Sequence, residues 1–340
     1  MSLNQVHQVR SPLSELLGVD YPIVSAPMAQ DPALPAAVSN AGGLGTVGMG
    51  WADDAGDVFR DVAKLTDRPF GGNFVLYADQ HRRLDQALSA GLRIVTLFWG
   101  DADGYVDPVH DAGGLVIHAV GSAEEARRAV AAGVDVIVAQ GREAGGHVWG
   151  GVATLPLVPA VVDAAGPVPV IAAGGIGDAR GVAAVFALGA QGAWLGTRFL
   201  LADEMPIHEI YRQHVIDATE TDAEWYPNLY EVGWPNAPHR AIRNSTAQQW
   251  EAAGRPQPGH RPGEGEVIAH FASGDPVLRY SPAPPMVGTT GEIEAMSLWA
   301  GQSVALASRR QPAAEIVAEL AAGLMPPADT DQPSTPRRSA

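Results

Sequence analysis

Short, mostly apolar runs alternate with alanine-rich helical segments along the first 195 residues, and this alternation restricts the fold more than any other feature. Runs that are apolar on both faces, rather than at every second position, are typical of strands buried on both faces of a parallel sheet. We expect eight such strands, at Ile23–Ala26, Leu44–Val47, Gly72–Leu76, Ile94–Phe98, Leu115–His118, Val134–Ala139, Val168–Ala172 and Gly192–Leu195.

The segments between these runs have the apolar spacing of helices, and several end in glycine, a common helix stop. Strict alternation of strands and helices requires a parallel sheet, and eight repeats favour its closure into a (β/α)8 TIM barrel. The clearest expected helices are Leu34–Asn40, Asp57–Leu65, Leu84–Ala90, Ser122–Ala132 and Ala179–Leu188.

The alternation stops after the eighth strand. Residues 201–290 contain scattered prolines and the Gly/Pro-rich stretch Gly254–Gly265, and they are too long for a plain loop. We therefore expect a small, mostly helical insertion that caps a barrel made of residues 1–200 and 291–325. Helices are expected at Ile293–Ser308 and Pro312–Leu324, followed by a disordered tail over residues 326–340.

The net charge of −16 argues against a nucleic-acid or anionic-membrane partner, because either would need a basic face. The first ten residues are polar, and no apolar run reaches the ~18 residues needed to cross a bilayer. We expect a cytoplasmic protein with small-molecule partners. The sequence leaves the oligomeric state open, a homodimer included.

Cysteine is absent, which excludes thiolate nucleophiles, iron–sulfur clusters and cysteine-ligated zinc. The histidines lack the paired spacing of a metal site, so no metal is expected. Lys64 is the only lysine, and it lies in an expected helix rather than after a strand. This position excludes a Schiff-base aldolase and a pyridoxal phosphate enzyme, which need a lysine at the barrel mouth.

The run Gly43–Gly48 matches the Gly-x-Gly-x-x-Gly pattern of dinucleotide-binding folds. That pattern must follow a strand and open a helix, whereas this run follows an expected helix and enters a strand. We interpret its glycines as a tight helix-to-strand turn.

Two further glycine-rich loops follow the seventh and eighth strands, at 171–177 and 195–198. In barrels these two loops form the standard phosphate site, since glycine lets backbone N–H groups approach the phosphate and a helix N-terminus favours its charge. Turn glycines without a ligand are the alternative, and Arg198 either contacts the phosphate or forms a surface salt bridge. The residues predicted to hold the phosphate are Gly174, Gly175, Gly196 and Thr197.

The loop Gln140–His147 follows the sixth strand, at the catalytic face of a barrel. Its glycines, Gly145 and Gly146 among them, permit close backbone approach to a planar ligand. Histidine is the side chain best able to move a proton near neutral pH. A lone loop histidine is usually only solvated, but this position makes His147 the candidate catalytic residue.

Other strand ends carry candidate pocket residues. Ala26-Pro27-Met28 ends the first strand, where Met28 offers a backbone N–H and a polarisable side chain to a ring, although core packing explains it nearly as well. Asn73 interrupts an apolar strand and needs a partner, either a cofactor or a backbone group. Trp99 and His118 should face the barrel mouth, as pocket walls or as substrate contacts.

Several of these segments together resemble the nitronate monooxygenases, also called 2-nitropropane dioxygenases. The most specific is Glu143–His147, although FMN-dependent enoyl-acyl-carrier-protein reductases and some NAD(P)H:quinone reductases carry close variants. The other matching segments are 26–28, 38–45, 139–141, 173–176, 196–199, 242–244 and 299–302.

The resemblance implies FMN as cofactor, with Met28, Asn73 and Gln140 against the flavin ring and Gln302 from the last helix nearby. It implies that His147 deprotonates or orients a nitro substrate, which is oxidised with O2 to a carbonyl compound and nitrite. His118 is unusual for the family at its position. The alternatives are an NAD(P)H-dependent enoyl or quinone reductase on the same fold and, from another class, a non-catalytic phosphate-binding protein.

Overall fold

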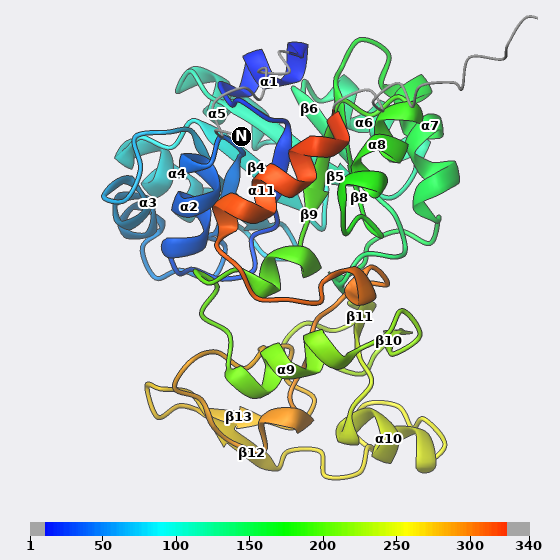
Figure 1. The fold of residues 1–340 in the computed structure, drawn as a ribbon. Coiled ribbons are helices and arrows are strands. Elements are labelled where there is room, and N and C mark those ends of the chain that lie inside the picture. Colours follow the sequence, from blue (N-terminus) through cyan, green and yellow to red (C-terminus); the bar gives the residue numbers. More distant parts are fainter. Residues whose placement is uncertain (1–10, 325–340) are drawn as a thin grey trace, which may run out of the picture.

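The computed structural model describes residues 11–324, so the expected tail at 326–340 lies outside the described residues. Eight parallel strands form one sheet at the centre of the molecule (Figure 1). These strands are β1 (Ile23–Ser25), β2 (Gly45–Gly48), β3 (Phe70–Val75), β4 (Ile94–Phe98), β5 (Leu115–Val120), β6 (Val136–Gln140), β8 (Val170–Ala173) and β9 (Gly192–Leu195).

The sheet closes into a barrel. Its order is β1-β9-β8-β6-β5-β4-β3-β2, and a parallel bridge between Val24 and Leu44 joins its two edges. The predicted TIM barrel is confirmed, and each of the eight predicted strands overlaps an observed one. The positions of these strands were predicted correctly because both faces of each strand are buried, so that most of its residues are apolar.

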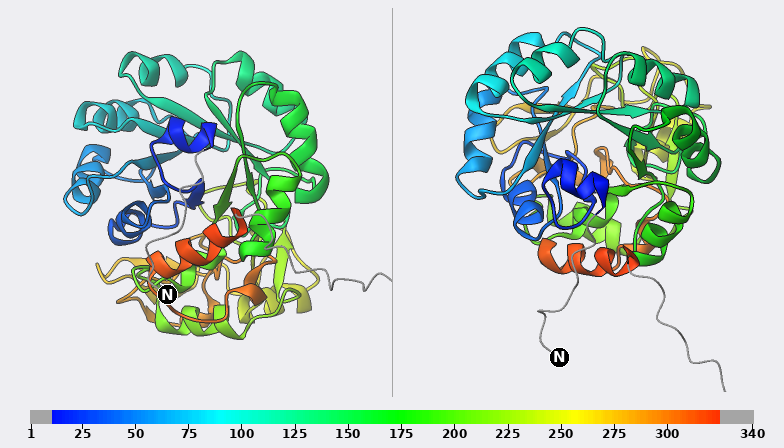
Figure 2. Two further views of the ribbon diagram at one scale, coloured as in Figure 1. Left: turned by 45° about the horizontal axis from the view of Figure 1, so that its top comes forward. Right: turned by 90° about the horizontal axis from the view of Figure 1, so that it is seen from above.

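Helices surround the barrel as an outer ring, which Figure 2 shows in the view from above. All five of the clearest expected helices are confirmed. No helix within residues 11–324 combines the length and apolar character needed to span a membrane. The ring consists of α2 (Ala33–Asn40), α3 (Ala55–Ala63), α4 (His81–Ala90), α5 (Val106–Asp111), α6 (Ala123–Ala131), α7 (Thr154–Ala165), α8 (Ala179–Ala187) and α11 (Ala313–Ala321).

The two ends of the barrel are closed differently. At the amino ends of the strands, Leu13 and Leu17 of α1 (Pro12–Leu17) pack into a buried cluster with interior residues such as Val24 and Ile117. The inserted segment lies at the opposite end, where the strands finish, in the lower half of Figure 1. Only the carboxyl end of the barrel is therefore left to form a site, as in other barrels of this type.

The glycine run at 43–48 is a turn from α2 into β2, as predicted. Gly45 shows why a side chain is excluded there. A Cβ on Gly45 would lie 1.9 Å from the carbonyl oxygen of Pro35 in α2. The glycine thus lets the helix backbone lie directly on the strand.

The insertion is mixed rather than mostly helical, which corrects the prediction. Its strands form two small three-stranded sheets, one of which includes the two-residue strand β7 (Gly146–His147) from the barrel. Pairing between distant segments, which leaves little local pattern, accounts for the difference. The elements are η1 (Thr197–Leu201), α9 (Glu209–Asp217), β10 (Ala223–Tyr226), β11 (His239–Ile242), α10 (Ser245–Ala252), β12 (Val267–His270), β13 (Pro276–Leu278) and β14 (Thr290–Gly291).

The helix expected at Ile293–Ser308 is wrong. The segment has only two short 3-10 turns, η2 (Ile293–Ala295) and η3 (Val304–Leu306). Between them the backbone is bonded to distant partners: the Ile242 N–H donates to the Leu298 carbonyl, and the Gln302 N–H donates to that of Glu143. The helix expected at Pro312–Leu324 is confirmed as α11 with the turn η4 (Ala322–Leu324).

The contact at Gly45 predicts a large effect of a small change. Gly45→Ala should lower the free energy of unfolding by about 2 kcal/mol or more, because the new methyl meets backbone rather than a movable side chain. Gly151→Ala is the matched control, since a Cβ there meets nothing within 4 Å. Urea unfolding measures both, and equal stability of the two variants would contradict this packing.

Candidate active site

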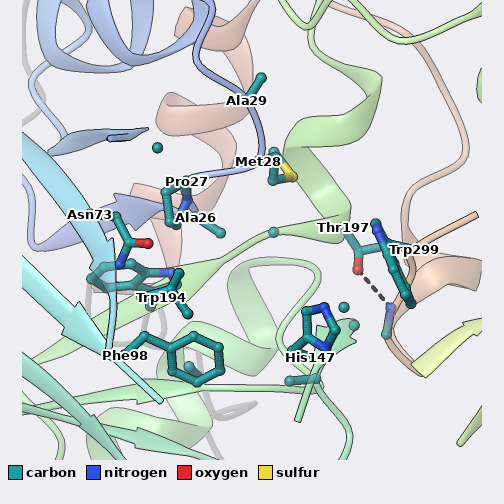
Figure 3. A pocket seen from close by; sticks show the side chains of 18 of the residues that line it. Ala26, Pro27, Met28, Ala29, Asn73, Phe98, His147, Trp194, Thr197 and Trp299 are labelled. Carbon is teal, nitrogen blue, oxygen red and sulfur yellow. Dashed lines mark hydrogen bonds between the residues drawn. The ribbon is translucent and has the colours of Figure 1, made fainter. Parts of the chain in front are cut away.

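A cavity of about 650 Å³ opens at the carboxyl ends of the barrel strands. Figure 3 shows Met28, Asn73, Phe98, His147 and Trp299 around it, from the barrel and from the segment that returns out of the insertion. Its size is that of a cofactor or small-molecule site. We take it as the candidate active site.

The two predicted phosphate loops meet on one wall of this cavity. Gly174 and Gly175 have positive φ values of 99° and 73°, a conformation that favours glycine. The N–H groups of Gly175 and Ile176 have no hydrogen-bond acceptor among the described residues. Gly196 and Thr197 also line this wall. Unpaired N–H groups in a glycine loop suit an anion, so the residues present fit a phosphate here.

The side chains beside these loops differ in what they offer. Thr197 Oγ1 accepts a hydrogen bond from the Gly301 N–H at 2.9 Å, which leaves its own hydroxyl proton to donate. Arg198 does not line the cavity. It is buried and pairs with Glu319 of α11 at 3.1 Å. Of the two roles left open for Arg198, the salt bridge is therefore observed, although it is buried rather than on the surface.

Residues at the ends of β1 and β3 form the opposite part of the wall. The Met28 N–H donates to the Ala26 carbonyl at 3.0 Å, so it is used within its own loop, and only the side chain is offered to the cavity. Asn73 Nδ2 donates to Thr96 Oγ1 at 2.9 Å. Its Oδ1 accepts no hydrogen bond from the described residues and remains available to a ligand.

Gln140 fixes the loop that carries His147. Its Nε2 donates to the His147 carbonyl, and its Oε1 accepts from the Trp149 N–H, both at 3.1 Å. Gln140 lines the cavity, but its amide already has partners at both ends. Its contribution in this structure is to hold the loop.

The loop is also held from outside by the insertion. β7 pairs antiparallel with β11, so that His147 lies opposite His239 and Gly146 lies opposite Arg240. Gly145 packs against the returning segment, and a Cβ there would lie 2.4 Å from the Gly301 nitrogen. Gly145 is thus needed for packing, whereas Gly146 has a positive φ of 70°, a conformation that favours glycine.

His147 lies in an aromatic surround. Its ring centroid is 3.8 Å from that of Trp234, 5.4 Å from that of Trp299 and 5.7 Å from that of Trp99. The pKa of His147 is lowered to about 3, chiefly by burial and to a smaller extent by the neighbouring His239. The imidazole is therefore neutral at physiological pH.

The two ring nitrogens of His147 are not equivalent. Nδ1 is buried and has no hydrogen-bond partner. Nε2 is not among the buried atoms and forms no hydrogen bond with a described residue. Nε2 is therefore the nitrogen that a molecule in the cavity can reach.

His239 is held neutral beside His147. Its Nδ1 donates to the Ala237 carbonyl at 2.8 Å, and its Nε2 accepts the Tyr230 N–H at 3.0 Å. Burial lowers the pKa of His239 to about 4. Both imidazoles are uncharged, so their close approach carries no electrostatic repulsion.

Three predicted residues do not face the cavity. His118 is buried on the outer face of β5, because its neighbours Ile117 and Ala119 point inward and strand side chains alternate. The prediction that His118 faces the mouth is therefore wrong. The side chain of Gln302 is exposed and lies outside the cavity. Trp99 does not line the cavity, although it packs edge-on against His147.

Sequence reasoning missed the contribution of the insertion. Trp234, Trp299 and His239 all contact His147, and none lies near it in the sequence. No local motif marks Trp234 or His239, and Trp299 lies in the matching segment 299–302 without having been given a role. Their role depends on the pairing of β11 with β7, which the sequence pattern does not reveal.

Comparison with known proteins gives the family of this chain. The model of the nitronate monooxygenase family matches residues 10–87 and 75–323. A hydroxy-methyl-oxo-octahydroindene-carboxyl-CoA dehydrogenase of Mycobacterium tuberculosis is 34% identical over 255 residues, which are 73% of this chain and 70% of that protein.

Two solved structures share the fold over nearly the whole chain. FabK from Thermotoga maritima has a TM-score of 0.79 and 31% identity, covering 93% of this chain and 96% of that one. A nitroalkane oxidase from Streptomyces ansochromogenes has a TM-score of 0.72 and 27% identity, covering 92% and 98%. These similarities indicate an oxidoreductase, and flavin dependence is general to the family.

The lowered pKa of His147 predicts a loss of stability in acid. An unfolded histidine has a pKa of about 6.5, so between about pH 6.5 and 3 the unfolded chain binds a proton that folded His147 does not. The free energy of unfolding should therefore decrease as the pH is lowered through this window. Between pH 7 and 5 the wild type should lose about 1–2 kcal/mol more than His147→Asn.

Urea unfolding at the two pH values measures this difference. His270→Asn, which alters an exposed histidine, is the control and should lose as much as the wild type. If His147→Asn also lost as much, the imidazole would not be held neutral by the fold.

Proposed function

The chain belongs to the nitronate monooxygenase family, and from that premise we propose that it oxidises alkyl nitronates or nitroalkanes with O2 to a carbonyl compound and nitrite, using FMN. The observation that carries the proposal is His147. A neutral imidazole with an accessible Nε2 lines a cavity whose other wall offers unpaired N–H groups to a phosphate.

The residues for the cofactor follow from the two walls. Gly175, Ile176, Gly196 and the Thr197 hydroxyl would hold the FMN phosphate, with Gly174 allowing the close approach. Ala26, the Met28 side chain and Asn73 Oδ1 would lie along the flavin ring. When bound, FMN supplies the two-electron acceptor of the reaction and the route of those electrons to oxygen.

His147 would act on the substrate proton. Its resting form at neutral pH is already the basic one, so Nε2 can accept a proton from the carbon that bears the nitro group. The same burial that keeps the ring neutral makes it a weak base, because it disfavours the imidazolium. A nitronate, which has already lost this proton, avoids the step, and for this reason nitronates come first among the proposed substrates.

Replacing this base should separate the two substrate forms. His147→Asn should keep FMN bound and lower turnover of a neutral nitroalkane by roughly 10²–10⁴-fold, the usual contribution of a general base. A preformed nitronate should lose much less. Steady-state oxygen consumption with both forms measures this difference. Native turnover of the nitroalkane by the variant would exclude His147 as the base.

A second candidate function is an NAD(P)H-dependent enoyl or quinone reductase. The similarity to FabK over 93% of this chain favours it. The same barrel, flavin and histidine loop would serve, with hydride delivered by a nicotinamide instead of electrons taken from a nitro compound.

An anaerobic titration distinguishes the two functions. We expect a nitronate to bleach the flavin spectrum of the purified protein within the mixing time at millimolar concentration, and NAD(P)H to do so poorly. Rapid bleaching by NAD(P)H with no response to nitronate would establish the reductase. A colourless protein that takes up no FMN would contradict both and favour the non-catalytic phosphate-binding protein.

A further inference from the structure

Four rings form one continuous wall from the mouth of the cavity inward. Trp51 lies 5.9 Å from Trp234, Trp234 lies 3.8 Å from His147, and His147 lies 5.4 Å from Trp299, all between ring centroids. All four residues line the cavity. The reactive imidazole is thus part of an aromatic surface that leads outward to Trp51.

The outer end of this wall is open. Trp51 is 50% exposed although it lines the cavity, whereas Trp234 is only 6% exposed. When an apolar group covers a large aromatic surface that is in contact with water, the free energy of the system falls. Trp51 therefore offers contact area that the protein itself does not use.

The rings are held in place from behind. Tyr77 stacks on Trp234 at 5.0 Å and contacts Trp51 at 5.4 Å, and its hydroxyl donates to the Gly233 carbonyl at 3.2 Å. Trp99 packs edge-on against Trp234 at 5.2 Å. A flat ligand would meet a surface whose orientation is already fixed, which lowers the entropic cost of binding.

The cavity is also without formal charge. Among the described residues that line it there is no Asp, Glu, Lys or Arg. Its ionisable side chains are His147, which is neutral, and Tyr211, whose pKa is raised by burial and whose hydroxyl donates to the Trp299 carbonyl. A substrate carboxylate or phosphate away from the glycine loops would lose its water without gaining a partner, which is costly.

We propose that this wall selects substrates in which a flat aromatic group is attached to the carbon that bears the reacting nitro group and which carry no other charge, with Trp51 and Trp234 as the specificity-determining residues. The inference rests on the proposed oxidation of nitro compounds. The proposed selectivity distinguishes this chain from an enzyme for nucleotide-linked substrates. The phosphates of such substrates would need partners that the wall does not provide.

Binding of unreactive probes to the FMN-loaded protein tests the proposal. Nitrobenzene and 4-nitrobenzoate share the aromatic nitro group, but only 4-nitrobenzoate carries a further charge. 2-Methyl-2-nitropropane is neutral and apolar but not flat, and like nitrobenzene it has no proton to remove. By calorimetry we expect nitrobenzene to bind at least tenfold more tightly than 4-nitrobenzoate, and roughly fivefold more tightly than 2-methyl-2-nitropropane.

A matched pair of variants assigns the effect to the wall. Trp51→Leu should weaken nitrobenzene binding by roughly five- to tenfold. Because Trp51 is half exposed, the change should leave the fold intact. Trp225→Leu is the control, since Trp225 packs under Arg142 at 4.3 Å, outside the cavity lining, and should leave the affinity unchanged.

Each outcome decides one point. Binding of 4-nitrobenzoate as tight as that of nitrobenzene, or a Trp51→Leu variant with native affinity for nitrobenzene, would overturn the inference. Because the probes are not turned over, the result does not depend on the reaction. Selective binding without any oxidation of nitronates would leave the wall's selectivity intact and remove the proposed function instead.

Discussion

The short pairing between β7 and β11 is the contact on which the site depends. A loop with glycines at 141, 145 and 146 has large conformational freedom, and ordering it costs free energy that its few side chains cannot supply. Two strand pairs, opposite His239 and Arg240, supply the order instead. Arg240 extends the effect, because its guanidinium donates to the carbonyls of Arg142 and Ala223. The insertion is therefore part of the framework of the candidate active site rather than only a cover.

The described residues that line the candidate site include polar groups but no charged side chains. The wall that fits a phosphate offers backbone N–H groups and one hydroxyl, and the wall around His147 is aromatic. Aromatic burial sets the protonation state of His147, and the neighbouring His239 can lie close because it too is neutral. Such an environment has few mobile charges to rearrange as a reaction proceeds, which is the condition for preorganised electrostatics.

The sequence was sufficient for the barrel and for one side of the site. Strands buried on both faces are mostly apolar, so each was located. The glycine loops after β8 and β9 follow from their positions. The remaining features of the site depend on the direction in which a side chain points and on contacts between segments distant in the sequence. His118 was misplaced because an apolar run does not show which face each residue takes. Trp234 and His239 were missed because they reach His147 only through pairing between segments about 90 residues apart.

The same pairing has a consequence for the order in which the protein is made. A growing chain that has emerged as far as residue 200 contains every barrel strand but not the partner of β7. The scaffold can thus condense while the histidine loop is still loose, and the loop is ordered only after β11 has been synthesised. The wall around His147 in the candidate active site is therefore completed only after the insertion has been synthesised.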